Sequence, residues 1–209
     1  MKIVAGKYGG RRLVTPKNRD IRPTSDKVRG AIFNMLVSRG AIEDAYVLDA
    51  FCGTGALGLE ALSRGARSCE FADKSRTSLG LARENVELLS VEEYVAYTFG
   101  DVRKTLKKQE NNELVHGNCR IGSLDSELAE DTENTYSLIF LDPPYNKSLI
   151  ASTLGVLKDA GKLYDGAWVV CESEKNLAYD NLDGFGVEAV KEYGSTKVAL
   201  LQYHEAYGK

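Results

Sequence analysis

The sequence contains little of what a metal site or a disulfide framework requires. Its only histidines are His116 and His204, and its four cysteines lie far apart with no CxxC pair. The cysteines are Cys52, Cys69, Cys119 and Cys171. Zinc sites need closely spaced ligands, and disulfide frameworks are typical of short, cysteine-rich secreted chains. We therefore expect no metal and no disulfide, and we expect free thiols in a reducing cytoplasm.

Long hydrophobic runs are also missing. No apolar stretch approaches the roughly 18 residues that a membrane span needs, so we expect no membrane-spanning segment. Residues 1–7 contain lysine but no apolar core behind it, so we expect no signal peptide. The 209 residues suffice for one ordinary domain with a small extension, and nothing in them demands more than a monomer.

The formal net charge of −3 is small, but the charges are unevenly distributed along the chain. Residues 1–39 contain ten lysines and arginines against two acids, a net charge of +8, and the other 170 residues carry −11. A basic arm on an acidic body is typical of a surface that binds a polyanion. Because only Tyr8 and Phe33 interleave with these charges, we expect the arm to bind phosphates rather than to stack on bases.

Strand-like and helix-like segments alternate along most of the chain. Short apolar runs predict strands at residues 45–50, 68–73, 94–99, 136–142 and 167–171, and periodic patterns predict helices at residues 25–38, 56–64, 75–89 and 148–161. The glycine-containing segment 2–14 predicts a short hairpin, and residues 186–192 and 196–204 predict a closing antiparallel pair. This alternation predicts an α/β fold with a doubly wound sheet.

Residues 109–135 interrupt the alternation. They contain seven acids against one arginine and few large apolar residues. Such a segment cannot bury enough apolar surface to fold on its own, so we expect an exposed, mobile insertion. The expected organisation is a basic extension at residues 1–40 followed by the main domain at residues 41–209, which carries this insertion.

A glycine-rich loop joins the first predicted strand of the sheet to its helix. Gly53, Gly55 and Gly58 fit the G-x-G-x-x-G spacing, and Asp73 follows 20 residues after Gly53 at the end of the next predicted strand. Glycines allow a cofactor to approach the backbone closely, and an acid at the second strand end can bind ribose hydroxyls. An NAD-dependent dehydrogenase must therefore be considered.

Asp49 favours S-adenosylmethionine over NAD. It lies four residues before the first glycine of the loop, at the end of the predicted strand. A carboxylate there is unfavourable beside a pyrophosphate but favourable beside the cationic amino group of a methionine portion. We therefore expect S-adenosylmethionine as the cofactor, with Asp73 on its ribose hydroxyls and Asp101 near its adenine amino group.

The strand predicted at residues 136–142 runs into Asp142-Pro143-Pro144-Tyr145. Prolines end a strand ladder, and ligands bind at the carboxyl ends of strands in an open parallel sheet. This motif suits methyl transfer to an exocyclic amino group of a nucleobase, a poor nucleophile whose N–H bonds need acceptors. Asp142 and the Pro143 carbonyl could accept them, and Tyr145 could stack on the base, a contact worth about 1–3 kcal/mol. A simple turn after a strand is the alternative.

Together these motifs resemble the class I amino-methyltransferases. The shared residues are Asp49-x-Phe51-x-Gly53-x-Gly55-x-Leu57-Gly58 and Asp142-Pro143-Pro144-Tyr145. Three further segments, residues 3–11, 22–29 and 58–66, resemble the bacterial RsmD family, which methylates the exocyclic N2 of one guanine in 16S ribosomal RNA. The Arg22-Pro23-Thr24 segment is the specific part of this resemblance.

The resemblance implies a Rossmann-like class I methyltransferase with a seven-stranded, mostly parallel sheet, an antiparallel carboxy-terminal pair, and an amino-terminal hairpin and helix that face RNA or cofactor. The implied cofactor residues are Asp49, Phe51, Gly53, Gly55, Asp73 and Asp101, with Thr24 folding over the cofactor or the base. The implied catalytic residues are Asp142, Pro143, Pro144 and Tyr145, and the implied RNA-binding residues are Arg11, Arg12, Arg22 and Arg29. The implied partner is 16S ribosomal RNA within the small ribosomal subunit or its assembly intermediate.

Three other classes of protein fit parts of the pattern. A DNA adenine or cytosine amino-methyltransferase would use the same motif but usually needs a target-recognition domain, for which we see no room. A protein glutamine methyltransferase usually has asparagine where this chain has Asp142. A non-catalytic ribosome-assembly factor would bind RNA on a vestigial fold, but the acids Asp49, Asp73 and Asp142 are all present.

Overall fold

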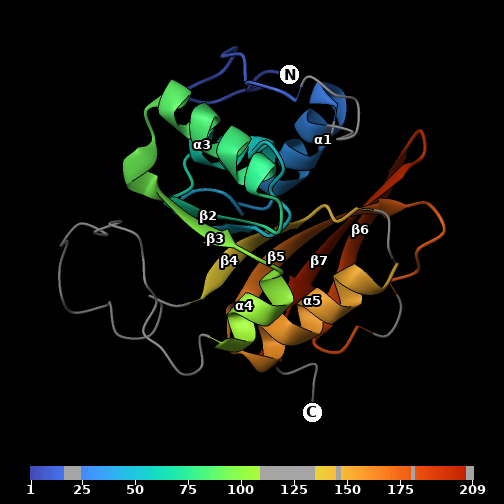
Figure 1. The fold of residues 1–209 in the computed structure, drawn as a ribbon. Coiled ribbons are helices and arrows are strands. Elements are labelled where there is room, and N and C mark those ends of the chain that lie inside the picture. The colour runs from blue at the N-terminus through green and yellow to red at the C-terminus, as the bar shows by residue number, and fades with distance from the viewer. Residues whose placement is uncertain (17–24, 109–134, 145–146, 180–181, 206–209) are drawn as a thin grey trace, which may run out of the picture.

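The computed structural model describes residues 1–16, 25–108, 135–144, 147–179 and 182–205. Its centre is a seven-stranded sheet with the strand order β3-β2-β1-β4-β5-β7-β6 (Figure 1). The strands are β1 (Tyr46–Asp49), β2 (Ser68–Asp73), β3 (Val95–Phe99), β4 (Tyr136–Leu141), β5 (Leu163–Glu174), β6 (Phe185–Tyr193) and β7 (Thr196–Tyr203). The helices are α1 (Asp26–Val37), α2 (Ala56–Ser63), α3 (Arg76–Leu89), α4 (Val102–Lys108) and α5 (Lys147–Asp159), with a 3-10 turn at Glu92–Tyr94.

Five strands are parallel, and the last two close the sheet in the antiparallel sense. β1 pairs in parallel with β2 and β4, β2 with β3, and β4 with β5, whereas β7 is antiparallel to both β5 and β6. The strand order reverses between β1 and β4, the place where open α/β sheets bind ligands. The prediction of a mostly parallel sheet with an antiparallel carboxy-terminal pair is confirmed.

Helices cover both faces of the sheet. Figure 1 shows α1 and α3 on one face and α4 and α5 on the other. β4 contributes to the apolar layer on each side, because Leu138 and Phe140 belong to one buried cluster and Ile139 and Leu141 to the other. Burial on both faces explains why this strand is a continuous apolar run rather than an alternating one.

Residues 1–16, called the amino-terminal arm below, pack against the α1/α3 face. Ile3 and Leu13 are buried in the same apolar cluster as Phe33 of α1. The predicted hairpin is reduced to one antiparallel bridge between Lys2 and Arg12. Ile3 and Leu13 donate their backbone N–H groups across this bridge, whereas amides of the intervening residues donate to side chains of α2.

The structure corrects the predicted elements at two further places. Helix α4 was not predicted; it follows Asp101, whose carboxylate accepts the backbone N–H of Arg103 in its first turn. The apolar run at residues 167–171 predicted a short strand, but β5 is twelve residues long. The longer strand forms because β5 pairs with β4 on one side and with β7 on the other.

The acidic insertion and a membrane-spanning helix are the two remaining points on which the sequence made an expectation. The predicted acidic insertion at residues 109–135 lies outside the described residues except for its last position, so its mobility stays a prediction. Within the described ranges, no helix combines the length and the apolar character that crossing a membrane requires.

Candidate functional site

Aspartates stand at the carboxyl ends of the central strands. Asp49 is the last residue of β1, and it pairs with Phe71 of β2 and Phe140 of β4. Asp73 and Asp142 each lie two residues beyond one of these partners, roughly 7 Å further along the strand direction. The three carboxylates therefore lie at one edge of the sheet, around the place where the strand order reverses.

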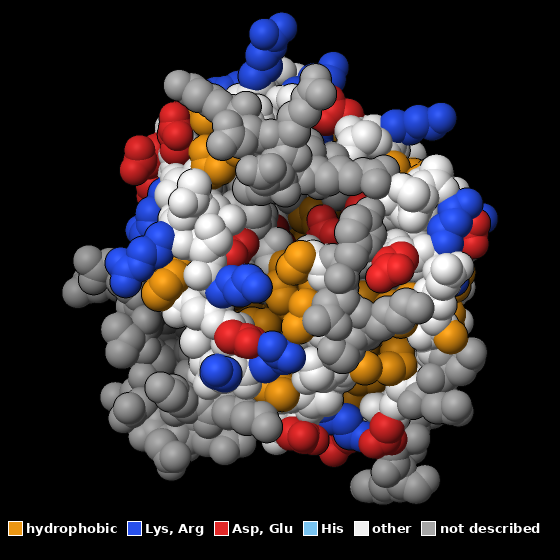
Figure 2. All heavy atoms as spheres, turned by 45° about the vertical axis from the view of Figure 1, so that its right-hand side comes forward, with side chains coloured by type: hydrophobic (Ala, Val, Ile, Leu, Met, Phe, Trp, Pro, Cys, Tyr) orange, Lys and Arg blue, Asp and Glu red, His pale blue; other side chains and the backbone are white. Residues whose placement is uncertain are grey.

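Asp101 continues this row toward the outer strand. Phe99, the last residue of β3, pairs with Asp73, and Asp101 follows two residues later. The row across the sheet is Asp101, Asp73, Asp49 and Asp142, each at the end of a different one of four adjacent strands. Figure 2 shows acidic and hydrophobic side chains around a hollow on the face turned to the viewer. The fold thus brings together the four acids that the sequence singled out.

Asp49 is almost completely enclosed, with 2% of its surface exposed. Its Oδ2 accepts a hydrogen bond of 3.0 Å from the backbone N–H of Gly58 in α2. Burial raises the pKa of Asp49 to about 7, and the nearby charge of Asp73 acts in the same direction. A positive group beside this carboxyl would favour its ionised form, so this part of the site suits a cation.

The loop between β1 and α2 follows a path that glycine permits. Gly53 and Gly55 have φ angles of +53° and +77°, in the left-handed region. A Cβ on Gly55 would lie 3.2 Å from Phe71 and 3.3 Å from Ala82, whereas one on Gly53 would meet nothing within 4 Å. Gly53 therefore leaves backbone open to a ligand. Phe51, half-buried, packs against the apolar cluster on the α4/α5 face.

Asp73 joins the glycine loop to the start of α3. One of its carboxylate oxygens accepts the N–H of Gly53 at 3.1 Å, and the other accepts the N–H of Ser75 at 2.8 Å. Ser75 in turn caps α3, because its hydroxyl accepts the N–H of Ser78. Each carboxylate oxygen has a further lone pair, so Asp73 can still accept hydrogen bonds from two neighbouring hydroxyl groups.

Asp101 is held by Arg103. Its two carboxylate oxygens accept from Nε of Arg103 at 2.9 Å and from Nη2 at 2.6 Å. Arg103 also donates to the hydroxyl of Ser152 in α5, so the pair is anchored to a second helix. The hydrogen bonds from the guanidinium lower the pKa of Asp101. Asp101 is therefore an ionised acceptor in a fixed position beside the end of β3.

Asp142 and the prolines follow β4 where it lies beside β1. Asp142 is half-buried, Pro143 is buried and Pro144 is exposed. Prolines have no amide hydrogen for the ladder, so strand pairing ends here and the backbone turns away. Tyr145 lies outside the described residues, and its stacking role stays a prediction.

The arginines expected to bind RNA fall into different settings. Arg11 and Arg12 are exposed on the amino-terminal arm, and the guanidinium of Arg11 donates to the carbonyl of Leu88 at the end of α3. Arg22 lies outside the described residues, as does Thr24, which was expected over the cofactor. Arg11 and Arg12 are thus placed where a phosphate could reach them.

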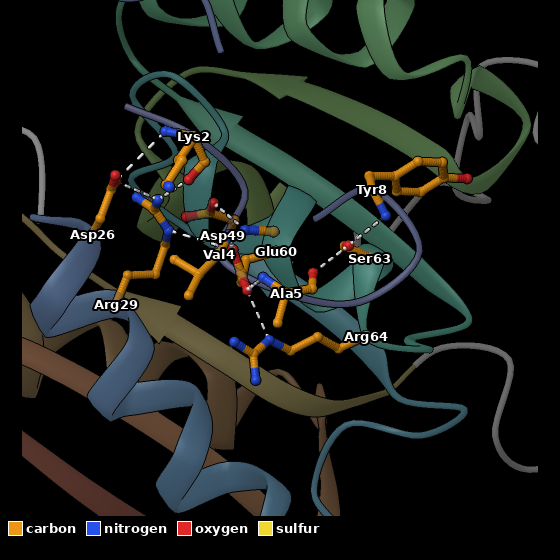
Figure 3. Close-up of polar contacts among 11 residues, drawn as sticks. Lys2, Val4, Ala5, Tyr8, Asp26, Arg29, Asp49, Glu60, Ser63 and Arg64 are labelled. Atoms are coloured by element: carbon orange, nitrogen blue, oxygen red, sulfur yellow. Dashed lines mark hydrogen bonds and ion pairs between the residues drawn. The ribbon is translucent and has the colours of Figure 1, made fainter. Parts of the chain in front are cut away.

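Arg29 requires a correction. Its side chain is fully buried and lies 2.7 Å from Asp26 and 3.6 Å from Glu60, and it also donates to the carbonyl of Lys2 (Figure 3). A guanidinium enclosed in this way cannot contact an RNA phosphate at the surface. Arg29 therefore ties α1 and the amino-terminal arm to α2, and the expected RNA contact was wrong.

Glu60 is a residue that the sequence reasoning missed. Its carboxylate accepts the N–H of Val4 at 2.6 Å, the N–H of Ala5 at 3.0 Å and Nε of Arg64 at 2.7 Å (Figure 3). Every residue of α2 is buried. A charged residue within such a short, otherwise apolar and small-residue helix was the signal for a buried partner.

The described residues offer no metal centre. No group of three or more His, Cys, Asp or Glu side chains among them could hold an ion. The cysteines that the structure describes, Cys52, Cys69 and Cys171, are buried and free. Burial raises the pKa of each of these thiols, so they are poor nucleophiles.

The chain is similar to known methyltransferases over most of its length. The model of a family described as conserved hypothetical protein 95 matches residues 1–117 and 116–202. Ribosomal RNA small subunit methyltransferase D of Escherichia coli (strain K12) is 33% identical, over 83% of this chain and 75% of its own. An uncharacterised methylase of Rickettsia prowazekii (strain Madrid E) is 29% identical, over 97% of this chain and 98% of its own. The solved structure of yhhF, a candidate methyltransferase of Escherichia coli, has a TM-score of 0.77 and 27% identity, covering 98% of both chains.

Proposed function

Since the chain belongs to the conserved hypothetical protein 95 family of RsmD-type methyltransferases, we propose that it methylates the exocyclic N2 amine of a guanine in 16S ribosomal RNA. The observation that carries this proposal is the row of acids at neighbouring strand ends, with Asp142 and Pro143 beside Asp49. The Escherichia coli relative is named for methylation of small-subunit ribosomal RNA. The choice of guanine N2 is supported by the resemblance to the RsmD family and by the amine-binding chemistry of Asp142.

The cofactor is S-adenosylmethionine, which supplies an electrophilic methyl group on its sulfonium when it is bound. Asp49 would bind the cationic amino group of its methionine portion, because the buried carboxyl gains most from a positive neighbour. The open backbone at Gly53 would lie beside its methionine and ribose portions. Asp73 would accept its ribose hydroxyls, and the fixed carboxylate of Asp101 would accept its adenine amino group.

The target amine needs acceptors more than it needs a strong base. The guanine would leave its stack to enter the site, as bases do when enzymes act on their ring substituents. Asp142 and the Pro143 carbonyl would accept the two N–H bonds of N2, which draws its lone pair out of the ring. Tyr145 would stack on the base and hold its plane. Positioning of this kind supplies a large part of the acceleration in reactions between two bound groups.

The transfer itself is a single displacement. The N2 lone pair would attack the methyl carbon that the cofactor supplies, so a nitrogen–carbon bond would form while the carbon–sulfur bond breaks and its electron pair stays on sulfur. The nitrogen becomes much more acidic as it gains the methyl group, and its proton then passes to Asp142 or to water. The products are N2-methylguanine and S-adenosylhomocysteine.

The substrate is bound by the basic part of the chain. Residues 1–39 carry a net charge of +8, and Arg11 and Arg12 are exposed there. Phosphate contacts from such a surface would orient the RNA without reading its sequence. The rest of the chain is acidic, so we place the substrate as 16S RNA within the small subunit or an assembly intermediate, where ribosomal proteins add surface. A reaction on this substrate belongs to the cytoplasm, and a monomer suffices for it.

The proposal is tested by methyl transfer from labelled S-adenosylmethionine to small ribosomal subunits from cells that lack this gene, with duplex DNA in parallel. Label recovered from ribosomal RNA as N2-methylguanine is the expected result. Label only in DNA, as N6-methyladenine or N4-methylcytosine, would keep the role of Asp142 but overturn the RNA substrate. No transfer to either, with RNA still bound, would favour a non-catalytic assembly factor.

A further inference from the structure

Asn85 is a fully buried polar side chain of α3 that the proposed reaction does not use. Its Nδ2 donates to the carbonyl of Thr54 at 2.9 Å and to the carbonyl of Val14 at 3.1 Å. Its Oδ1 accepts the backbone N–H of Val14 at 2.6 Å. Both amide hydrogens and the amide oxygen are therefore engaged. These bonds join α3, the glycine loop and the amino-terminal arm.

On the loop side, Asn85 fixes the peptide between Thr54 and Gly55. The carbonyl of this peptide accepts from Asn85, and its N–H donates to the carbonyl of Cys52 at 2.7 Å. Because a peptide unit is planar, bonds at both ends set its orientation. Gly55 contributes the N–H of this peptide, and Gly53 precedes Thr54; the left-handed φ angles of both glycines need glycine's conformational freedom. Asn85 therefore restrains a peptide of the loop that is flanked by glycines.

On the arm side, Asn85 binds Val14 as a neighbouring strand would. It takes both the N–H and the carbonyl of this residue, although Val14 belongs to no strand. In the sequence, Val14 shortly precedes Arg22 and Thr24, the residues expected near the base and the cofactor. Asn85 thus links the glycine loop at Thr54 to the amino-terminal arm at Val14.

We propose that Asn85 is a positioning residue that makes cofactor binding and attachment of the arm a single cooperative event. This inference rests on the proposed function. A ligand that immobilises the glycine loop holds the Thr54 carbonyl against Asn85, and Asn85 then holds Val14. Since the arm carries the exposed arginines, bound cofactor raises the affinity for RNA through this side chain, and RNA raises the affinity for cofactor by the same factor.

Ser63 offers a matched control at the other end of the arm. Its hydroxyl accepts the N–H of Tyr8 at 3.0 Å and donates to the carbonyl of Ala5 at 2.6 Å. It is buried at the end of α2, so it anchors the same arm by the same kind of bond. Its contacts go to the arm and not to the glycine loop. Loosening the arm at Ser63 therefore separates general loosening from coupling through Asn85.

The first test uses the wild-type protein and S-adenosylhomocysteine. Calorimetry establishes binding, and residue-resolved hydrogen exchange compares the amides of Val14 and Tyr8, which both donate to side chains of the main domain. Ligand should slow exchange at Val14 at least about fivefold and change Tyr8 less than about twofold. Equal slowing at both amides, or no change at Val14 despite binding, overturns the inference alone. Absence of binding overturns the proposed function and this inference with it.

The second test compares Asn85→Ala with Ser63→Ala. The dissociation constant of S-adenosylhomocysteine should rise about tenfold in Asn85→Ala and less than about twofold in Ser63→Ala. The gain in RNA affinity on adding S-adenosylhomocysteine should disappear in Asn85→Ala and persist in Ser63→Ala. Equal effects of the two variants on both quantities would mean that Asn85 only stabilises the arm, and would overturn the inference.

Discussion

The protonation state of the Asp49 carboxyl depends on its burial and on whether a cationic group is bound beside it. Burial at the end of β1 raises its pKa to about 7. The ionised form is the one that attracts the amino group of the proposed cofactor. Below pH 7 the free protein carries a proton on Asp49, and a cationic ligand must displace it. The affinity for such a ligand is therefore linked to pH through this residue.

We expect the affinity for S-adenosylhomocysteine to fall as the pH is lowered below about 7, by at most about tenfold per pH unit. The expected sign follows from the raised pKa, because protonation of Asp49 competes with binding of the amino group. Calorimetry across about two pH units on either side of neutrality measures the profile. Asp49→Asn should bind more weakly above pH 7 and show no such dependence. A flat wild-type profile would remove Asp49 from cofactor binding.

Substitutions of Asp142 and Asp73 should affect different quantities, the first the rate of methyl transfer and the second the affinity for cofactor. Asp142→Ala removes the proposed acceptor for the target amine, so we expect methyl transfer to fall by at least about 100-fold with the dissociation constant of S-adenosylhomocysteine unchanged. Asp73→Ala removes the proposed ribose contact and should weaken that binding instead. Single-turnover transfer and calorimetry give the two quantities. Near-normal transfer by Asp142→Ala would exclude it from the mechanism.

The role of a single residue could be predicted from the sequence where it depends on neighbouring residues in the chain, such as a strand end followed by a turn. Asp49 and Asp73 stand out because each ends a strand and precedes a turn, and parallel strands align their carboxyl ends. Arg29 shows the limit of such reasoning. The family resemblance implied an RNA contact for it, but its partner Glu60 lies in another helix. No local pattern indicates that the fold brings these two charges together.

At the scale of elements, packing of α2 on β2 depends on one glycine. A Cβ on Gly58 would lie 2.4 Å from Sγ of Cys69 and 2.5 Å from Phe71. Gly58→Ala should therefore destabilise the protein by about 1–3 kcal/mol, because the helix must move from the strand. The same shift displaces the N–H that Asp49 accepts, so cofactor affinity should also fall. Chemical denaturation and calorimetry measure the two effects.

Gly80 of α3 is the matched control. It is exposed, and a Cβ there would meet nothing within 4 Å. Gly80→Ala should stabilise the protein by up to about 1 kcal/mol, because alanine favours the helix and restricts the unfolded chain. If both substitutions stabilised the protein, close packing at Gly58 would not be the reason for glycine there.

Elements with a buried apolar pattern and clear ends could be predicted, and elements set by other parts of the chain could not. α1 begins after Ser25, whose side chain caps it as the sequence indicated, and β2 has the predicted bounds. The predicted hairpin of the arm is limited to one antiparallel bridge, and other amides of the arm donate to Glu60 and Ser63 of α2. Helix α4 has only seven residues, too few for a clear periodic pattern.

At the scale of the molecule, the arm and the main domain share one core and one buried charge cluster. Arg29 and Glu60 are both fully buried, and Ile3 lies in the cluster that contains Phe33. Removing one partner of a buried ion pair costs about 3–5 kcal/mol because the other charge stays unpaired. The segment that carries the basic surface is therefore anchored to the core at Ile3, and Asn85 holds it at Val14.

This placement makes the salt dependence of RNA binding a measure of the arm. Arg11 and Arg12 are exposed, so Arg11→Ala and Arg12→Ala should each reduce the slope of log affinity against log salt by about one. Lys158, at the end of α5 on the opposite face of the sheet and paired with Asp183, is the control whose substitution should leave the slope unchanged. Filter binding of 16S RNA between about 50 and 200 mM salt gives the slopes. Equal reductions in all three variants would mean that net charge, and not the arm, attracts the RNA.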